Sequence, residues 1–526
     1  MTELSGRRFT KEERSWIMYD WANSIYATNI MAAIFPTIFV AFAGDQGDLW
    51  WGYGTSFATL IIAFLAPLLG SIADYQGMKK KMFTAFMLLG VIATALIALT
   101  NDWRFMLVAY VVSKIGFSGS NLFYDGFLTD VTTNERMDKV SSWGYAMGYI
   151  GGSTIPFVIS IAVLLALGYS SPIAQKFSIL ITSVWWLVFS IPFLKNVEQK
   201  HYIERPEKIS FRHAFDNVLK TAGDIVKSRG MLLFILAYFF YIDGVGTVIS
   251  ISTAYGAALG LGATGMILAL LVTQIVAMPC SILFAWLARR ISTRKALLLA
   301  IAVYMFICLV GFYMGFSLEP HQDAYNEAYA QEQSVIQESY DGYAFEDSKA
   351  AHTFLDNLLT SAKRNLTAQK NPIGDLSIDE NAFSPADLTL IKQASEDINT
   401  RLLTFNEKQH SIISRYRGAI NFSTILFWCM AVLVGTVQGG IQAVSRSYFG
   451  KLVPKKRSNE YFGFFDIFGK FATVVGPFLY ALIGGLTGRS SFGALCLMLL
   501  FLAGFVILIA ARKPLDELEA QRAVQD

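Results

Sequence analysis

Two charged residues stand deep inside stretches of the sequence that are long and apolar enough to cross a bilayer. Lys114 lies about ten residues into the stretch 104–129, and Asp243 about twelve residues into 231–256. A charge at the centre of a membrane helix costs roughly 2.5–3.5 kcal/mol on insertion scales, so such residues are candidates for function. We expect both to face a central cavity and to pair with each other or with a ligand that carries a carboxylate and an amine. A purely structural buried pair is the alternative.

An acidic residue also opens the first apolar stretch. The segment "YDWANSIYATNI", residues 19–30, places Asp20 and Asn23 three residues apart and so on one face of a helix. Asp20 is either an anion near a helix N-terminus in the headgroup layer, or a gating or proton-carrying carboxylate. The neighbouring Trp16 and Trp21 are typical of residues that anchor a helix at the membrane surface.

Polar residues with helical spacing mark two stretches near the C-terminus. Arg446 ends a stripe that recurs every four residues, and we expect it to act as a latch or anchor. Asp466 and Lys470 are also four apart, in the acid-before-base order that favours an ion pair within one helix. The neutral residues that we expect to line a cavity are Gln274, Gln438 and Gln442.

A gate is predicted where several of these stretches end. Tyr124 and Asp125 close the stretch 104–129 at the same expected depth as Arg446. We expect Asp20, Asp125, Asp130 and Arg446 to form one network there.

Membrane-spanning helices must position these residues. The 526 residues are 54% hydrophobic, and the mean hydropathy is +0.44. Because only helices satisfy all of their backbone groups within such a segment, we expect an all-α polytopic membrane protein without a removable signal peptide. The expected spans are 16–42, 51–73, 82–100, 104–129, 142–168, 174–194, 231–256, 263–287, 296–316, 418–447, 461–484 and 490–511.

The distribution of basic residues predicts the orientation. With both termini in the cytoplasm, the inward loops and tails hold 28 Lys and Arg, whereas the short outward loops hold three. This bias follows the positive-inside rule. We therefore expect both termini in the cytoplasm and, in a bacterial cell, a place in the inner membrane.

The sequence divides into two similar halves. Asp20 and Asp243 fall at matching places in the first and seventh spans, and Gly144 and Gly463 at matching places in the fifth and eleventh. We expect two six-helix bundles, 1–194 and 230–526, joined by a basic cytoplasmic linker at 195–229. Such a repeat is the layout of a secondary transporter with its site between the halves.

The loop between the second and third spans carries the most specific motif. It reads "GSIADYQGMKKK", in which Gly70 allows close helix approach, Asp74 can cap a helix or pair with a base, and Gly77 permits a tight turn. Lys80 belongs to the basic run that holds the loop at the inner surface. The pattern resembles the signature loop of the major facilitator superfamily. The second half has a degenerate copy, with Ala288 where the aspartate would be.

Longer matches narrow the resemblance. "YDWANSIYATNI", "GYAMGYIGG" and "QGGIQAVSRSYFGKLVP" are similar to the vacuolar amino-acid effluxer family, which comprises the autophagy-related permease of fungi and its bacterial relatives. The resemblance implies the major facilitator fold and a secondary active transporter. It implies efflux of a small polar solute such as an amino acid, and proton coupling through Asp243 or Asp20 is consistent with a carboxylate in a low-dielectric cavity.

The segment 317–416 departs from that family pattern. It contains 16 Asp and Glu residues and fewer basic ones, and "NPIGD" and "FSPAD" are expected to separate its amphipathic helices. We expect a solvated helical cap on the extracytoplasmic side. The alternative is a domain that captures substrate or binds a protein partner, which would allow a transport-inactive receptor or scaffold.

Several kinds of chemistry find no support in the sequence. There is no GxxxxGK[ST], HExxH or GxSxG motif, so we expect neither an enzyme nor an ATP-driven pump. The four cysteines fall within expected spans and lack a CxxC spacing, so we expect no cofactor and no metal site. The expected partners are a small-molecule substrate and the lipid bilayer, with no nucleic acid, and the protein is expected to be a monomer.

Overall fold

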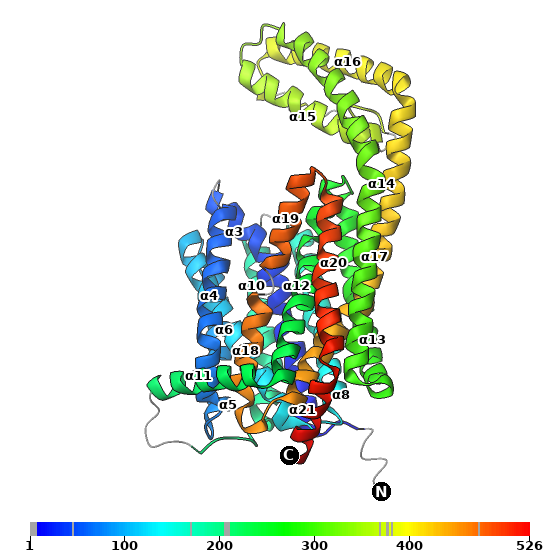
Figure 1. Cartoon of the computed structure of the whole chain (residues 1–526). Helices are drawn as coiled ribbons and strands as arrows, with labels where there is room; N and C mark the ends of the chain where they lie inside the picture. The colour runs from blue at the N-terminus through cyan, green and yellow to red at the C-terminus, as the bar shows by residue number, and fades with distance from the viewer. Residues whose placement is uncertain are drawn as a thin grey trace.

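A bundle of long helices makes up the protein. The computed structural model describes residues 8–44, 47–168, 171–204, 211–367, 370–374, 378–379, 382–471 and 474–525. Twelve helical segments within these ranges are long and apolar enough to cross a membrane. They pack side by side, and two of them extend well beyond the bundle (Figure 1). The prediction of an all-α membrane protein with twelve spans is confirmed.

The first six spans form the N half, and two of them are interrupted. Spans one and five each contain a wide π-helical segment, and the helix that follows begins with a proline at its first or second position. Proline lacks an N–H group and clashes with the preceding turn, which disfavours a continuous α-helix. The elements are α2 (Lys11–Ile25), η1 (Tyr26–Ala33), α3 (Phe35–Ala43), α4 (Gly47–Ala73), α5 (Met78–Ile97), α6 (Trp103–Gly126), α7 (Leu128–Val131), α8 (Met137–Met147), η3 (Gly148–Thr154), α9 (Ile155–Leu167) and α10 (Pro172–Asn196).

The other six spans form the C half, in which span eleven is broken. Helix α18 ends at Phe471 and α19 begins at Val475, followed directly by Gly476 and Pro477. The elements are α12 (Arg229–Ala258), α13 (Ala263–Ile291), α14 (Thr293–Asp341), α17 (His410–Leu452), η5 (Lys455–Arg457), α18 (Ser458–Phe471), α19 (Val475–Thr487), α20 (Ser490–Ala510) and α21 (Arg512–Gln525). Between the halves lies α11 (Phe211–Lys227), whereas residues 205–210 of the predicted linker lie outside the described residues.

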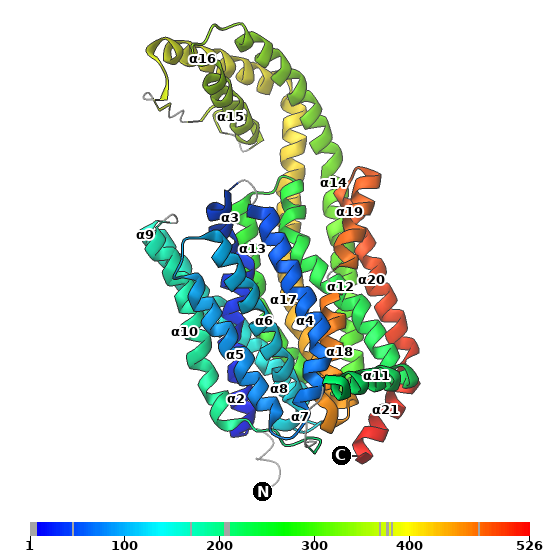
Figure 2. The same ribbon diagram turned by 90° about the vertical axis from the view of Figure 1, so that its left-hand side faces the viewer.

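The two ends of the bundle differ. We call the end that carries both termini the terminus face, and the opposite end the insertion face (Figure 2). Helices α8 and η3 pack against α13, and α4 packs against α18, whereas α3, α9 and α19 pack mainly within their own halves. Hydrogen bonds between described residues of the two halves gather toward the terminus face, for example from Ser141 Oγ to the Ala443 carbonyl. The halves are therefore closed together at the terminus face.

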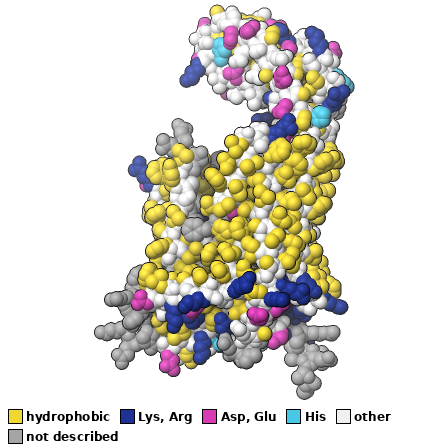
Figure 3. Space-filling model, in the orientation of Figure 1, with side chains coloured by type: hydrophobic (Ala, Val, Ile, Leu, Met, Phe, Trp, Pro, Cys, Tyr) yellow, Lys and Arg dark blue, Asp and Glu magenta, His cyan; other side chains and the backbone are white. Residues whose placement is uncertain are grey.

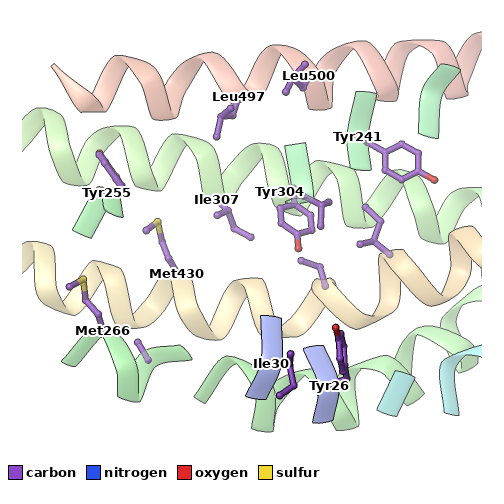
Figure 4. Close-up of a cluster of buried hydrophobic side chains, with 14 of the residues drawn as sticks. Tyr26, Ile30, Tyr241, Tyr255, Met266, Tyr304, Ile307, Met430, Leu497 and Leu500 are labelled. Carbon is purple, nitrogen blue, oxygen red and sulfur yellow. The ribbon is translucent and has the colours of Figure 1, made fainter. Parts of the chain in front are cut away.

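The surface shows how the bundle suits a membrane. On the side shown in Figure 3 a broad apolar band covers the spans, and Lys and Arg side chains gather below it at the terminus face. Inside the bundle, aromatic and aliphatic side chains from neighbouring spans interlock (Figure 4). Tyr304 of α14 stacks on Phe501 of α20, with 5.1 Å between the ring centroids.

The insertion is built as an extension of two spans. Spans nine and ten were expected to end at 316 and to begin at 418, but α14 continues to Asp341 and α17 begins at His410. Helices α15 (Ser348–Thr367) and α16 (Pro385–Lys408) lie across their tips (Figure 1). The hydroxyls of Tyr325 and Tyr329 on α14 donate to backbone carbonyls of α15. These buried tyrosines explain why α14 stays helical outside the bundle, since they give its polar extension a packed face.

Candidate functional site

Arg446 is the centre of a buried charged cluster that joins the two halves. It lies on α17, and its Nη1 donates to Asp125 Oδ1 at 3.0 Å while its Nη2 donates to Asp20 Oδ2 at 3.2 Å. Its Nε donates to Ser141 Oγ at 3.0 Å. The structure thus brings Asp20, Asp125 and Arg446 together, with two carboxylates sharing one guanidinium. Such charge-assisted hydrogen bonds are strong and directional.

Aromatic rings enclose this cluster. The Arg446 guanidinium carbon lies 4.7 Å from the ring centroid of Trp16 and 4.4 Å from that of Tyr145, which are cation–π distances. Trp16 stacks on Tyr124, and the Tyr124 hydroxyl donates to Asp20 Oδ2 at 2.7 Å. The expectation that Trp16 anchors the helix at the membrane surface is therefore wrong, because its side chain is fully buried beside Arg446.

A glycine allows the helices to meet at this point. A Cβ atom at Gly144 of α8 would overlap the Asp20 carboxylate and press on the Arg446 guanidinium. Small residues of this kind let neighbouring helix backbones approach closely. The first glycine of the segment "GYAMGYIGG", Gly144, therefore leaves the space that the ion pair of Asp20 and Arg446 occupies.

Three charged side chains near the cluster are partly accessible to water. The side chains of Asp125 and Asp466 each keep 28% of their surface exposed, and that of Lys470 keeps 19%. Asp466 and Lys470 form the ion pair within α18 that their spacing predicts. Asp466 is also close enough to Asp125 to interact with it electrostatically. A polar solute that reaches these side chains meets charges of both signs.

Lys114 and Asp243 do not pair with each other, so that part of the expectation is wrong. The Lys114 ammonium donates to the Thr55 carbonyl of α4 at 3.1 Å, and its charged neighbour is Lys470. Asp243 is fully buried, and its Oδ2 accepts from the backbone N–H of Gly476 at 2.9 Å. The break between α18 and α19 supplies that free N–H group, so the carboxylate turns into its own half instead of toward Lys114.

The remaining predicted cavity residues form no hydrogen bond to the described residues of the cluster. Asn23 donates to Asn121 Oδ1 at 2.6 Å inside the N half. Gln442 donates to the Gln438 carbonyl one turn earlier on α17, at 3.3 Å. Gln274 is partly exposed, and its Oε1 accepts no hydrogen bond from the described residues.

The signature loop forms a second contact between the halves. The Asp74 carboxylate accepts from the backbone N–H groups of Asn459 and Glu460, both at 3.0 Å, and so caps the start of α18. Burial raises the pKa of Asp74 to about 7, against the opposing effects of Lys79 and of these N–H donors. The aspartate therefore caps a helix, one of the two roles expected for it, and the helix belongs to the opposite half.

The other loop residues have separate places. A Cβ atom at Gly70 would overlap the Asn459 carbonyl, and Gly77 has a φ of 71°, in the left-handed region that glycine adopts without strain. Lys80 is partly exposed and borders a surface groove with Tyr202. Asp130, which was expected in the gate network, instead accepts from Lys79 Nζ at 2.7 Å and from His201, so that expectation is corrected.

Asp138 is a functional candidate that sequence reasoning missed. Its carboxylate, buried on α8, accepts from Thr293 Oγ1 at 2.9 Å and from Lys451 Nζ at 2.6 Å, both in the C half. Thr293 belongs to the degenerate second copy of the signature loop. The sequence did offer a sign of this role. Ala288 stands where the loop motif has its aspartate, so another acidic residue had to hold the second copy of the loop.

The comparisons with known proteins agree with this architecture. A family model described as "Vacuole effluxer Atg22 like" matches residues 50–135, 129–323 and 423–515. The MFS-type transporter YxiO of Bacillus subtilis is 38% identical in an alignment of 515 positions that covers 95% of each chain. Autophagy-related protein 22 of Eremothecium gossypii is 33% identical over 94 residues, 18% of each chain.

Solved structures show the same fold. A bacterial homologue of the iron transporter ferroportin, solved in an outward-facing state, superposes with a TM-score of 0.55 at 12% identity, over 96% of this chain and 98% of that one. The fucose:proton symporter of E. coli gives 0.55 at 12% identity, over 95% and 97%. At 12% identity the likeness to both structures concerns the fold alone.

Proposed function

The chain belongs to the Atg22-like vacuole effluxer family of major facilitator transporters, and from this premise we propose that it exports a small zwitterionic solute, with amino acids as the first class to test. As a member of that family it is an integral membrane transporter and not an enzyme. The export direction rests on the family description. The positive-inside distribution of Lys and Arg supports a cytoplasmic terminus face.

The observation that carries the proposal is the cluster around Arg446. Its guanidinium, from the C half, binds two carboxylates of the N half at the closed end of the bundle. Alternating access requires that one end close while the other opens. These ion pairs form only while the terminus face is closed, so they are suited to act as its gate.

The substrate site lies next to that gate in our proposal. Lys114 of the N half and Lys470 of the C half are near enough to repel each other, and a carboxylate between them would relieve that repulsion. The exposed carboxylates of Asp125 and Asp466 would receive the substrate amine. Asp243 plays no part in binding, because it is buried against the backbone of α19.

We assign proton coupling to the two carboxylates that share the Arg446 guanidinium. Two carboxylates face one cation, so one negative charge is unmatched within the triad. Taking a charge out of water is costly, and protonation removes that cost. Asp125 is the more exposed of the two carboxylates, and we propose that it exchanges a proton with water when Arg446 withdraws.

Flux in proteoliposomes tests the proposal. The purified protein would be reconstituted with an imposed pH gradient, and uptake of a pool of radiolabelled amino acids would be followed. We expect the gradient to accelerate flux, and Asp125→Asn to leave exchange of unlabelled for labelled solute while removing the effect of the gradient. Flux that ignores the gradient in the native protein would exclude the coupling, and absence of any amino-acid flux would exclude the substrate class.

A further inference from the structure

Helix α11 runs across the spans, not along them. It lies at the terminus face, roughly perpendicular to the bundle in both views (Figures 1 and 2). Its last residue, Lys227, precedes the cap Ser228 of the membrane span α12. Because a span begins within two residues of its end, α11 is held at the level of the membrane surface.

One face of α11 contacts the signature loop of the N half and the residue before α18 of the C half, which are the two sides of the contact made by Asp74. Thr221 and Asp224 accept hydrogen bonds from Arg457, which directly precedes α18. Asn217 Nδ2 donates to the hydroxyl of Tyr75 at 3.3 Å, and Tyr75 follows Asp74 in the signature loop. Thus α11 touches the residue next to the capping aspartate and the residue next to the capped helix.

Another face of α11 is apolar and open. Phe215, Leu219 and Val226 expose 45%, 57% and 63% of their surface. At about 100° per residue they lie within roughly 40° of one another around the helix. Lys220 and Lys227 project from the flank between this apolar face and the bound one.

The lipid bilayer is the occupant that fits this apolar face. Helix α11 lies at the end of the bundle where Lys and Arg side chains gather below the apolar surface of the spans (Figures 1 and 3). Helices with an apolar stripe, a basic flank and this orientation lie at the boundary between headgroups and acyl chains. Exposed lysines beside the stripe complement the phosphate layer.

We propose that α11 is an interfacial strap: its apolar face docks into the bilayer surface, and its opposite face holds Arg457 and Tyr75 so that the terminus face stays closed. The lipid surface thereby acts on the gate through α11. The docking is independent of the substrate proposed above, whereas the effect on closure rests on the proposed alternating access.

Spin-label accessibility tests the docking. Labels would be placed by Leu219→Cys and, as a matched control one residue away, by Lys220→Cys, in full-length protein whose four native cysteines are replaced. Single copies would be embedded in phospholipid nanodiscs. We expect the Leu219→Cys label to be accessible to oxygen and shielded from an aqueous nickel complex, and the Lys220→Cys label to show the reverse. Equal access of nickel to both labels would overturn the docking, and shielding only when two copies share a disc would assign the face to a second copy.

Distance measurements test the strap. Labels at Lys81→Cys in the N half and Lys513→Cys in the C half would report separation at the terminus face. We expect Phe215→Gln with Leu219→Gln to increase the fraction of wide distances several-fold, and Lys220→Gln, which removes only one lysine beside the apolar face, to increase it less. An unchanged distribution, with the Leu219→Cys label still shielded, would overturn the strap and leave the docking intact. If the native protein transports no amino acid, that result would overturn the proposed substrate class and leave the docking and the strap untouched.

Discussion

Asp20 and Asp243 occupy matching places in the first span of each half, yet their surroundings differ. Asp20 accepts hydrogen bonds from Arg446 of the opposite half and from Tyr124. Asp243 accepts from the backbone of Gly476 in its own half, and the described residues give it no cation. One carboxylate is thus balanced by a cation across the interface, and the other is held by a backbone N–H group within a single half.

This difference separates two ways to keep a charge inside a membrane. A carboxylate paired across the halves loses its partner when they move apart, so its stability depends on the conformation. A carboxylate held by a backbone N–H group of its own half keeps that partner when the halves move apart as rigid units. If the proposed gate operates, Asp20 would therefore respond to the separation of the halves, and Asp243 would have a local structural role.

Removing the cation that Asp20 and Asp125 share should have the largest effect on closure of the terminus face. Arg446→Gln leaves Asp20 and Asp125 facing each other without a guanidinium, and loss of one partner of a buried ion pair costs roughly 3–5 kcal/mol. We expect the terminus face to lose its closed state by more than a hundredfold in population and transport to be abolished. Distances between labels on the two halves measure the first effect. Arg446→Lys, which keeps the charge without the planar fork, should fall between the two proteins.

Replacing Asp20 and Asp243 separately by asparagine tests whether the two carboxylates differ in their effect on closure. Asp20→Asn keeps an acceptor for Tyr124 but loses a charge-assisted bond to Arg446, so we expect about 2 kcal/mol less stabilisation of closure. Asp243→Asn can still accept from Gly476, so we expect unchanged distances between the halves and at most about 1 kcal/mol lower unfolding free energy. Label distances and thermal unfolding in the same lipid would show both. Opening caused by Asp243→Asn alone would reverse the assignment.

The sequence predicted the parts of the molecule that depend on composition and short-range spacing. Twelve apolar stretches and the ion pair of Asp466 with Lys470 follow from hydropathy and helical periodicity. The orientation of Asp243 does not, because it depends on the break near Gly476 and on which way one side chain turns. Nor does the pairing of Asp138 with Lys451, since residues 313 apart meet only through the packing of the halves.

The signature-loop contact should respond to pH. Burial holds the pKa of Asp74 at about 7, against an ordinary value of about 4, despite Lys79 and the Glu460 N–H that oppose the shift. The closed state therefore binds more protons than an open state in which Asp74 is solvated, between about pH 4 and pH 7. Raising the pH through that window should weaken closure, with no further change above it. The same distance pair, followed across the window, should lose this dependence in Asp74→Asn.

The ion pair within α18 should give the smallest effect. Asp466 and Lys470 keep 28% and 19% of their side chains exposed, and pairs four residues apart on a helix contribute about 0.3–0.5 kcal/mol. Lys470→Gln should therefore leave closure and thermal stability nearly unchanged. It should still raise the KM for an amino-acid substrate several-fold, because the proposal places the substrate carboxylate beside Lys470 and Lys114. An unchanged KM would show that Lys470 does not bind substrate, and Arg446 would remain the functional cation of the C half. A large loss of the closed state would instead show that the ion pair of α18 belongs to the gate.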